Sequence, residues 1–277
     1  MSNEPMKIDI DKVLRQRLPR HYRYIPRFAV RWLERTICQD RLNTILQQMA
    51  GKNSVDAATA ALDEMDITVE ATGLDRLPVG RFMFVSNHPL GGLDGLALIS
   101  LLGNRYEHNI KFMVNDLLMA VEPLHGVFLP VNKYGSQSRA TATQLEEALR
   151  SDDQFITFPA GLCSRMQDDG SIADLPWQKS AVVHATNYQR DIVPVYFDAV
   201  NSRFFYRFAK WRKRLGIKFN IELVFLPKEM IKKSGSTLRV IIGEPIPWTT
   251  LDASHPKQEA ARLRESVINM SPTPSKP

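Results

Sequence analysis

Residues 81–103 combine, in immediate succession, a short apolar run, a stretch of turn-forming residues and a longer apolar run. The first run, "RFMFVSN" (81–87), has the length and composition of a β-strand, and the last, "LDGLALISLLG" (93–103), has helical length and leucine spacing. Between them stands "HPLGG", in which proline disfavours a helical conformation of the residue before it and the glycines can adopt positive φ. The order strand, turn, helix is typical of α/β folds. It places the turn at the carboxyl end of a strand, where open α/β sheets form their ligand crevice.

The turn contains a histidine and is followed closely by an aspartate, His88 and Asp94. On a straight helix these two residues would lie about 240° apart, and along a strand they would be about 20 Å apart. Regular structure therefore keeps them from touching, whereas a curled turn can bring the carboxylate back to the imidazole. From this local pattern alone two interpretations stay open: His88 is a hydrogen-bonded turn residue, or it is a catalytic group oriented by Asp94.

Six further apolar runs are spaced like the strands of an α/β domain, with helix-compatible stretches such as residues 138–151 between several of them. A chain of 277 residues, 44% of them hydrophobic, can bury one large core, so we expect one main domain with an appendage. No apolar run approaches the roughly 18 residues of a membrane-spanning helix. The two cysteines show no metal-type spacing, which favours a reducing, cytosol-facing location without a structural disulfide. The six runs are residues 111–116, 126–132, 154–161, 191–198, 221–227 and 238–246.

The N-terminal part of the chain is basic, with eight lysine and arginine residues from Lys12 to Arg35 and a single acid, Glu34. Pro26 suits the start of a helix, after which apolar residues recur on one face and arginines on another. A second such segment, residues 201–220, carries seven basic residues, no acid and interleaved aromatic residues. Both suit the surface of an anionic membrane, but basic and aromatic residues also suit single-stranded nucleic acid, so the segments alone leave the partner open. The residues predicted to contact a membrane are Arg27, Arg31, Trp32, Arg203, Phe204, Arg207 and Trp211.

Four short blocks occur in the order "NHPLGGLD", "GVFLPVN", "FPAGLCSR" and "IVPVYF". Together they resemble the glycerolipid acyltransferase family, of the lysophosphatidic-acid acyltransferase type, over roughly residues 65–250. This resemblance implies an α/β fold with a mixed sheet flanked by helices, here preceded by a basic helical segment. It also implies transfer of a fatty acyl group from an acyl carrier protein or coenzyme A thioester to a lipid hydroxyl. In that reaction His88 would be the general base, Asp94 would hold the imidazole, and no cofactor would take part.

The blocks also depart from the family pattern. Five residues rather than the usual four separate the histidine from the aspartate, and the second block ends in asparagine where the family usually has arginine. The third block has Ala160 in place of glutamate, and Leu162-Cys163 intervene before Ser164-Arg165. "NHPLGGLDG", the basic N-terminal segment and "NSRFFY" are most similar to a hemolysin-like branch that includes enzymes acylating singly acylated amino-acid lipids. An amino-acid lipid of the glycine or ornithine type is therefore the implied acceptor. One alternative is lysophosphatidic acid as the acceptor. The other is that the protein is a non-catalytic lipid- or nucleic-acid-binding module on the same fold.

The resemblance further implies which groups would hold the substrates. Backbone N–H groups of glycines are candidate donors to an oxyanion, and polar side chains of the later blocks are candidates for contact with the acceptor. The substrate-binding candidates are Gly91, Gly92, Asn132, Lys133, Gly161, Arg165 and Lys179. We expect residues 1–60 to form the basic membrane-contact segment, residues 61–268 the acyltransferase domain and residues 269–277 a disordered tail. The expected partners are an anionic membrane surface at the cytoplasmic face of the inner membrane, an acyl thioester and a lysolipid, without nucleic acid or metal.

Overall fold

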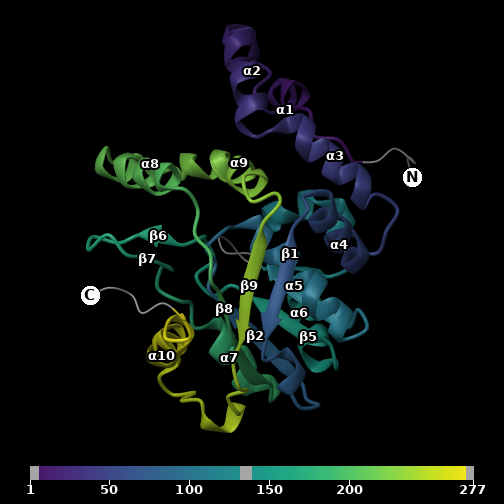
Figure 1. The fold of residues 1–277 in the computed structure, drawn as a ribbon, viewed down its shortest axis with the longest axis vertical. Helices are drawn as coiled ribbons and strands as arrows, with labels where there is room; N and C mark the ends of the chain where they lie inside the picture. Colours follow the sequence, from purple (N-terminus) through teal and green to yellow (C-terminus); the bar gives the residue numbers. More distant parts are fainter. Residues whose placement is uncertain (1–5, 132–138, 273–277) are drawn as a thin grey trace.

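The computed structural model describes residues 6–131 and 139–272, and a seven-stranded sheet forms its centre (Figure 1). Neighbouring strands are parallel except for one antiparallel pair, β8 with β9. The predicted mixed sheet is therefore confirmed. In spatial order the strands are β1 (Thr68–Thr72), β9 (Thr237–Ile242), β8 (Asp191–Phe197), β2 (Phe82–Ser86), β5 (Gln154–Thr157), β3 (Ile110–Val114) and β4 (Phe128–Pro130).

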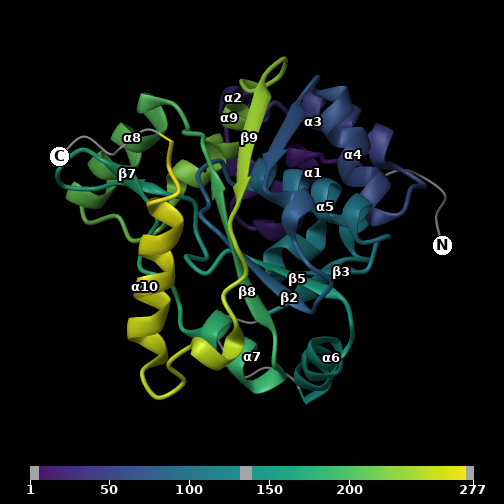
Figure 2. The ribbon, with the colours of Figure 1, turned by 60° about the horizontal axis from the view of Figure 1, so that its bottom comes forward.

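Helices cover both faces of the sheet (Figure 2). The central strand β2 shows this directly, because all five of its residues are buried. Phe82 and Phe84 belong to the core on one face, while Met83 and Val85 belong to the core on the other, as expected when successive side chains of a strand point to opposite sides. The first face is covered by α4 (Ser54–Glu64) and α5 (Gly92–Arg105), and the second by α6 (Arg139–Arg150), α7 (Ser180–Tyr188) and α10 (Pro256–Ile268).

The N-terminal basic segment is helical, as predicted, and lies at one end of the molecule (Figure 1). It forms α1 (Ile10–Arg17), α2 (Arg27–Thr36) and α3 (Gln39–Met49), and Pro26 caps the start of α2. The predicted domain boundary after residue 60 falls inside α4, in which Ala57, Ala58 and Ala61 are completely buried in the main core. The helix α4 thus packs as part of the α/β unit.

One predicted strand is wrong. Residues 221–227 form a 3-10 turn that runs into a short helix, α9 (Leu226–Ile231). Two features explain the difference: Pro227 stands in the first turn of α9, where proline suits a helix, and Glu222 turns inward to two arginines. Next to α9 lie α8 (Arg203–Arg214) and a small hairpin of β6 (Arg165–Met166) and β7 (Ile172–Ala173).

In residues 6–131 and 139–272, no helix combines the length and the apolar character that crossing a bilayer requires. Residues 273–277 of the predicted disordered tail lie outside the described residues, and the described part of the chain continues to residue 272 after α10 ends at Ile268.

Candidate active site

The histidine and the aspartate of the first block are in contact. The Nδ1 atom of His88 lies 3.0 Å from Oδ2 of Asp94. Because an ionised carboxylate can only accept, this contact places the imidazole proton on Nδ1 and leaves Nε2 as a proton acceptor. The His88 ring stacks on Phe158, with ring centroids 4.1 Å apart and planes 16° from parallel. Asp94 thus contacts one edge of the imidazole and Phe158 covers one face, while 18% of the His88 side chain stays exposed.

The turn between the two residues explains how they meet. Gly91 has φ of +85°, a conformation that L side chains rarely adopt, and it precedes the first residue of α5. The backbone N–H groups of Leu90 and Gly91 donate to Asp94 Oδ2 over 2.8 and 3.0 Å. The carboxylate therefore closes the turn at the start of the helix and orients the imidazole at the same time.

Asp94 is completely buried. Burial raises the pKa of this carboxyl group, and the hydrogen bonds from His88, Leu90 and Gly91 oppose that shift. A carboxylate in such a dry site interacts strongly with a positive charge that forms on the adjacent imidazole. The arrangement therefore suits a histidine that takes up a proton during a reaction.

Two asparagines, one directly before His88 and one far away in the sequence, fix the ends of this turn. The side-chain amide of Asn87 donates to the carbonyl of Phe197 over 3.0 Å and accepts from its N–H over 2.7 Å, so it joins the ends of β2 and β8. The amide of Asn201 donates to the carbonyl of Pro89 over 2.9 Å and is buried. These bonds make the backbone around His88 rigid before any substrate arrives.

A buried aspartate that the sequence analysis missed, Asp174, contacts the turn that carries His88. Its Oδ1 atom accepts from the backbone N–H of His88 over 3.1 Å and from the hydroxyl of Ser164 over 2.6 Å. Its Oδ2 atom accepts from the indole N–H of Trp177 over 2.9 Å. Ser164 in turn donates its backbone N–H to the carbonyl of His88. The third block is thereby joined to the turn that carries His88, and the only signal in the sequence is an acid within the apolar stretch "IADLPW".

Replacing Asp174 by alanine is expected to lower the free energy of unfolding by at least about 3 kcal/mol, because three buried donors lose their acceptor at about 1–3 kcal/mol each. Urea unfolding followed by circular dichroism measures the change. The matched control is Asp169→Ala, since Asp169 is exposed and accepts from Ser171 within its own turn. Equal, small losses in the two variants would contradict this role of Asp174.

The glycines predicted to supply backbone donors differ in what their N–H groups already do. The N–H of Gly91 donates to Asp94, and that of Gly161 donates to the carbonyl of Phe158 over 2.9 Å. Both N–H groups thus already have an acceptor within the protein, where they close turns. Within the described residues, the N–H of Gly92 has no acceptor, and Gly92 is exposed as the first residue of α5.

The polar side chains predicted to bind the substrates lie in different parts of the structure. Arg165 donates to Glu222 Oε1 over 3.0 Å, and Glu222, which is completely buried, also pairs with Arg212 at 2.7 Å. Lys179 is exposed at the start of α7, and the described residues show no contact between it and the histidine–aspartate pair. Asn132 and Lys133 lie outside the described residues.

The chain is similar in sequence to known proteins. A family model described as Acyltransferase matches residues 12–269 of the chain, which is nearly its whole length. The chain belongs to this acyltransferase family. A lyso-glycine lipid O-acyltransferase of Bacteroides thetaiotaomicron is 44% identical over 265 residues, which cover 95% of this chain and 97% of that protein. A protein of the same name from Phocaeicola vulgatus is 44% identical over 262 residues, with 94% of both chains covered.

Among solved structures, the chain is similar to the 1-acyl-sn-glycerophosphate acyltransferase PlsC of Thermotoga maritima. The TM-score is 0.48 at 15% sequence identity, over 88% of this chain and 97% of that one.

The acyltransferase has one buried and one partly exposed cysteine, Cys163 and Cys38. Burial raises the pKa of the Cys163 thiol, although nearby Arg165 opposes the shift, so less of the reactive thiolate forms at neutral pH. Iodoacetamide is therefore expected to modify Cys38 well before Cys163 in the folded acyltransferase, and both once it is unfolded, as measured by peptide mass spectrometry. Rapid native labelling of Cys163 would contradict this and would make a thiol nucleophile worth testing.

All seven residues predicted to contact a membrane are exposed. On α2 the Trp32 side chain is 58% exposed, and on α8 Phe204 and Trp211 are 52% and 55% exposed. Phe28, beside the predicted set, is 75% exposed. Both views place α2 and α8 towards the same end of the molecule (Figures 1 and 2). This acyltransferase therefore presents two basic helices with uncovered aromatic side chains on one end.

Proposed function

We propose that this acyltransferase transfers a fatty acyl group from a thioester to the free hydroxyl of a singly acylated glycine lipid. The observation that carries the proposal is the 44% identity, over nearly the whole chain, to two proteins named lyso-glycine lipid O-acyltransferase. The partly buried histidine–aspartate pair supports it, because such a pair can activate a hydroxyl group. The acyl carrier protein or coenzyme A is the proposed carrier of the donor thioester.

The proposed reaction uses His88 twice. Nε2 takes the proton of the acceptor hydroxyl as its oxygen attacks the thioester carbonyl, and Asp94 stabilises the imidazolium that forms. When the tetrahedral intermediate collapses, the carbon–sulfur bond breaks and the imidazolium returns the proton to the leaving thiolate. The N–H of Gly92, at the positive end of the dipole of α5, is the proposed donor to the oxyanion.

The ion pair of Arg165 favours an acceptor that carries no phosphate group. Its guanidinium is paired with the buried Glu222, which also binds Arg212. One negative charge thus lies between two positive charges before a substrate binds, which leaves a net charge of only +1. An arginine that is already paired with a carboxylate compensates less of the charge of a phosphate group. A phosphate dianion in a partly buried site would need strong compensation.

A competition assay tests the choice of acceptor. The acyltransferase is given equal amounts of monoacylated glycine lipid and lysophosphatidic acid, together with labelled acyl carrier protein thioester, and the labelled lipids are identified by mass spectrometry. The diacylated glycine lipid is expected as the main product. Phosphatidic acid as the main product would instead assign this protein to phospholipid synthesis. Repeating the assay with a coenzyme A thioester identifies the donor carrier.

Membrane binding is the second part of the proposal. The aromatic residues of α2 and α8 would enter the interface of an anionic bilayer while the arginines contact lipid headgroups. The acceptor of this reaction carries an acyl chain, so a surface that rests on a bilayer would bring the enzyme to it. The cytoplasmic face of the inner membrane is the proposed location.

The double substitution Phe28→Ala with Trp32→Ala is expected to weaken binding to anionic vesicles about tenfold or more, because burying such a side chain contributes about 1.5–3 kcal/mol. Cosedimentation with vesicles measures the binding, and added salt should weaken it further. Val79→Ala is the control, since Val79 is fully exposed in the loop before β2. Unchanged binding in the double variant, or equal binding to neutral vesicles, would contradict the proposal.

A further inference from the structure

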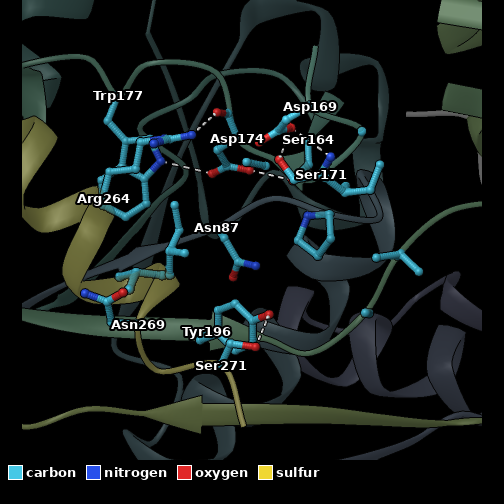
Figure 3. A pocket seen from close by; sticks show the side chains of 18 residues that line it. Asn87, Ser164, Asp169, Ser171, Asp174, Trp177, Tyr196, Arg264, Asn269 and Ser271 are labelled. Atoms are coloured by element: carbon cyan, nitrogen blue, oxygen red, sulfur yellow. Dashed lines mark hydrogen bonds between the residues drawn. The ribbon is translucent and has the colours of Figure 1, made fainter. Parts of the chain in front are cut away.

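A cavity of about 690 Å³ lies beside the catalytic turn, the turn that carries His88, on the side that faces α10. Its wall includes Asn87 and Pro89, the two neighbours of His88, and continues over the β6–β7 hairpin, the end of β8 and α10. Figure 3 shows Arg264, Trp177, Asp174 and Ser164 along one side, Tyr196 and Ser271 along the other, and Asn87 between them. The size is that of a pocket for a small molecule or headgroup. The proposed reaction mechanism does not use this cavity.

Arg264 carries the positive charge of this cavity. One of its N–H groups donates to the backbone carbonyl of Asp174 over 2.7 Å. Its Nε atom is buried and has no hydrogen-bond acceptor among the described residues, and none of their carboxylates lies within 4.0 Å of the guanidinium. By contrast Arg262, on the same helix, is paired with Glu259. A guanidinium that is partly buried without an anion is costly, and an anionic ligand would remove that cost.

The two acids of the cavity wall limit which anion fits. The carboxylate of Asp174 is occupied by three donors, and that of Asp169 by the N–H and hydroxyl of Ser171. A dianionic phosphate would face both negative charges with a single arginine to balance it. A carboxylate carries one charge and matches the planar fork of the guanidinium, so it is the better fit.

We propose that this cavity is a carboxylate-binding site, with Arg264 as the residue that binds the carboxylate. Asp174 joins the site to the catalytic turn, because its backbone carbonyl holds Arg264 and its side chain holds the N–H of His88. The carboxylate has two conceivable sources. It is either the headgroup of an N-acylated glycine acceptor, which rests on the proposed function, or a separate small carboxylate.

Binding of a soluble probe tests the site without any assumption about the reaction. Isothermal titration of the full chain compares N-acetylglycine with its neutral analogue N-acetylglycinamide. The acid is expected to bind at least about tenfold more tightly, and Arg264→Gln to remove that difference. Arg264→Lys, which keeps the charge, should retain part of it, and Lys257→Gln on the exposed side of the same helix should retain all of it. Equal affinity for acid and amide, no saturable binding of the acid, or binding unchanged in Arg264→Gln would each overturn the proposal.

The transfer assay then distinguishes the sources. If the site takes the acceptor headgroup, Arg264→Gln raises KM for the monoacylated glycine lipid but not for its glycinamide analogue. If the site takes a separate carboxylate, both KM values stay unchanged while binding of N-acetylglycine is lost. Should the wild-type enzyme transfer nothing to the glycine lipid, the proposed function fails, whereas the titration still decides whether the carboxylate site exists.

Discussion

Replacing His88 by alanine is expected to lower kcat for acyl transfer about 10²- to 10⁴-fold, the usual contribution of a general base. The expectation follows from the geometry: Nδ1 is held by Asp94, the ring is held by Phe158, and Nε2 remains to take the proton. Initial rates with saturating acceptor measure the change. Because the substitution leaves the acceptor's other contacts intact, KM is expected to change much less than kcat.

The chain offers a matched control for this substitution. His255 also has an aspartate at its Nδ1 atom, Asp252 at 2.9 Å, but both side chains are exposed at the start of α10. His255→Ala is expected to keep wild-type activity, because a histidine–aspartate contact acts as a base only where a substrate can be held beside it. An active His88→Ala enzyme would show that another group takes the proton.

Replacing Asp94 by asparagine is expected to lower kcat about 5- to 30-fold, since a hydrogen bond to a charged group is worth about 1–2 kcal/mol more than one to a neutral group. The N–H groups of Leu90 and Gly91 point at Oδ2, so the oxygen of the new amide must occupy that position. It still accepts from His88 Nδ1, which preserves the tautomer. The substitution therefore removes the charge that stabilises the imidazolium and keeps the geometry.

The stability of this variant provides an independent check. Burial raises the pKa of Asp94 in the folded protein, so above its ordinary pKa the folded state binds more protons than the unfolded state. The unfolding free energy then falls as pH rises through the interval between the two pKa values, and the ionised carboxylate does not stabilise the fold at neutral pH. Asp94→Asn is expected to lose activity with a smaller loss of stability at pH 7 than Asp94→Ala, because its amide oxygen keeps the three donors bonded while its amide nitrogen takes the place of Oδ1, a buried atom without a partner among the described residues. Asp94→Ala should lose both, because three donors lose their acceptor, and unchanged activity in both variants would contradict the role of Asp94.

The parts of the site that could be predicted from the sequence are those formed within one short segment. His88, Asp94 and the glycine that turns the chain between them all lie within "HPLGGLD", so the spacing and the turn residues allow their contact, which the structure shows. Asp174 and Asn201 bond to the same turn from 86 and 112 positions away. Such contacts depend on the strand order, which no local pattern contains.

The same limit applies to Arg165 and to the strand order. Arg165 lies in a recognisable block, but Glu222, the residue that pairs with it, comes 57 positions later from a run predicted to be a strand. An apolar run with a single acid does not reveal that the acid turns inward. Strand β9 was expected from its apolar pattern, whereas its position between β1 and β8, antiparallel to β8, required the structure.

The most direct test of the account is the product formed from labelled acyl carrier protein thioester and monoacylated glycine lipid. Mass spectrometry of the lipid fraction compares the wild-type enzyme with His88→Ala at equal concentrations of folded protein. The account predicts a labelled diacylated glycine lipid, esterified at the former hydroxyl, from the wild type and at most a trace from the variant. No ester from the wild type, or equal amounts from both enzymes, would contradict it.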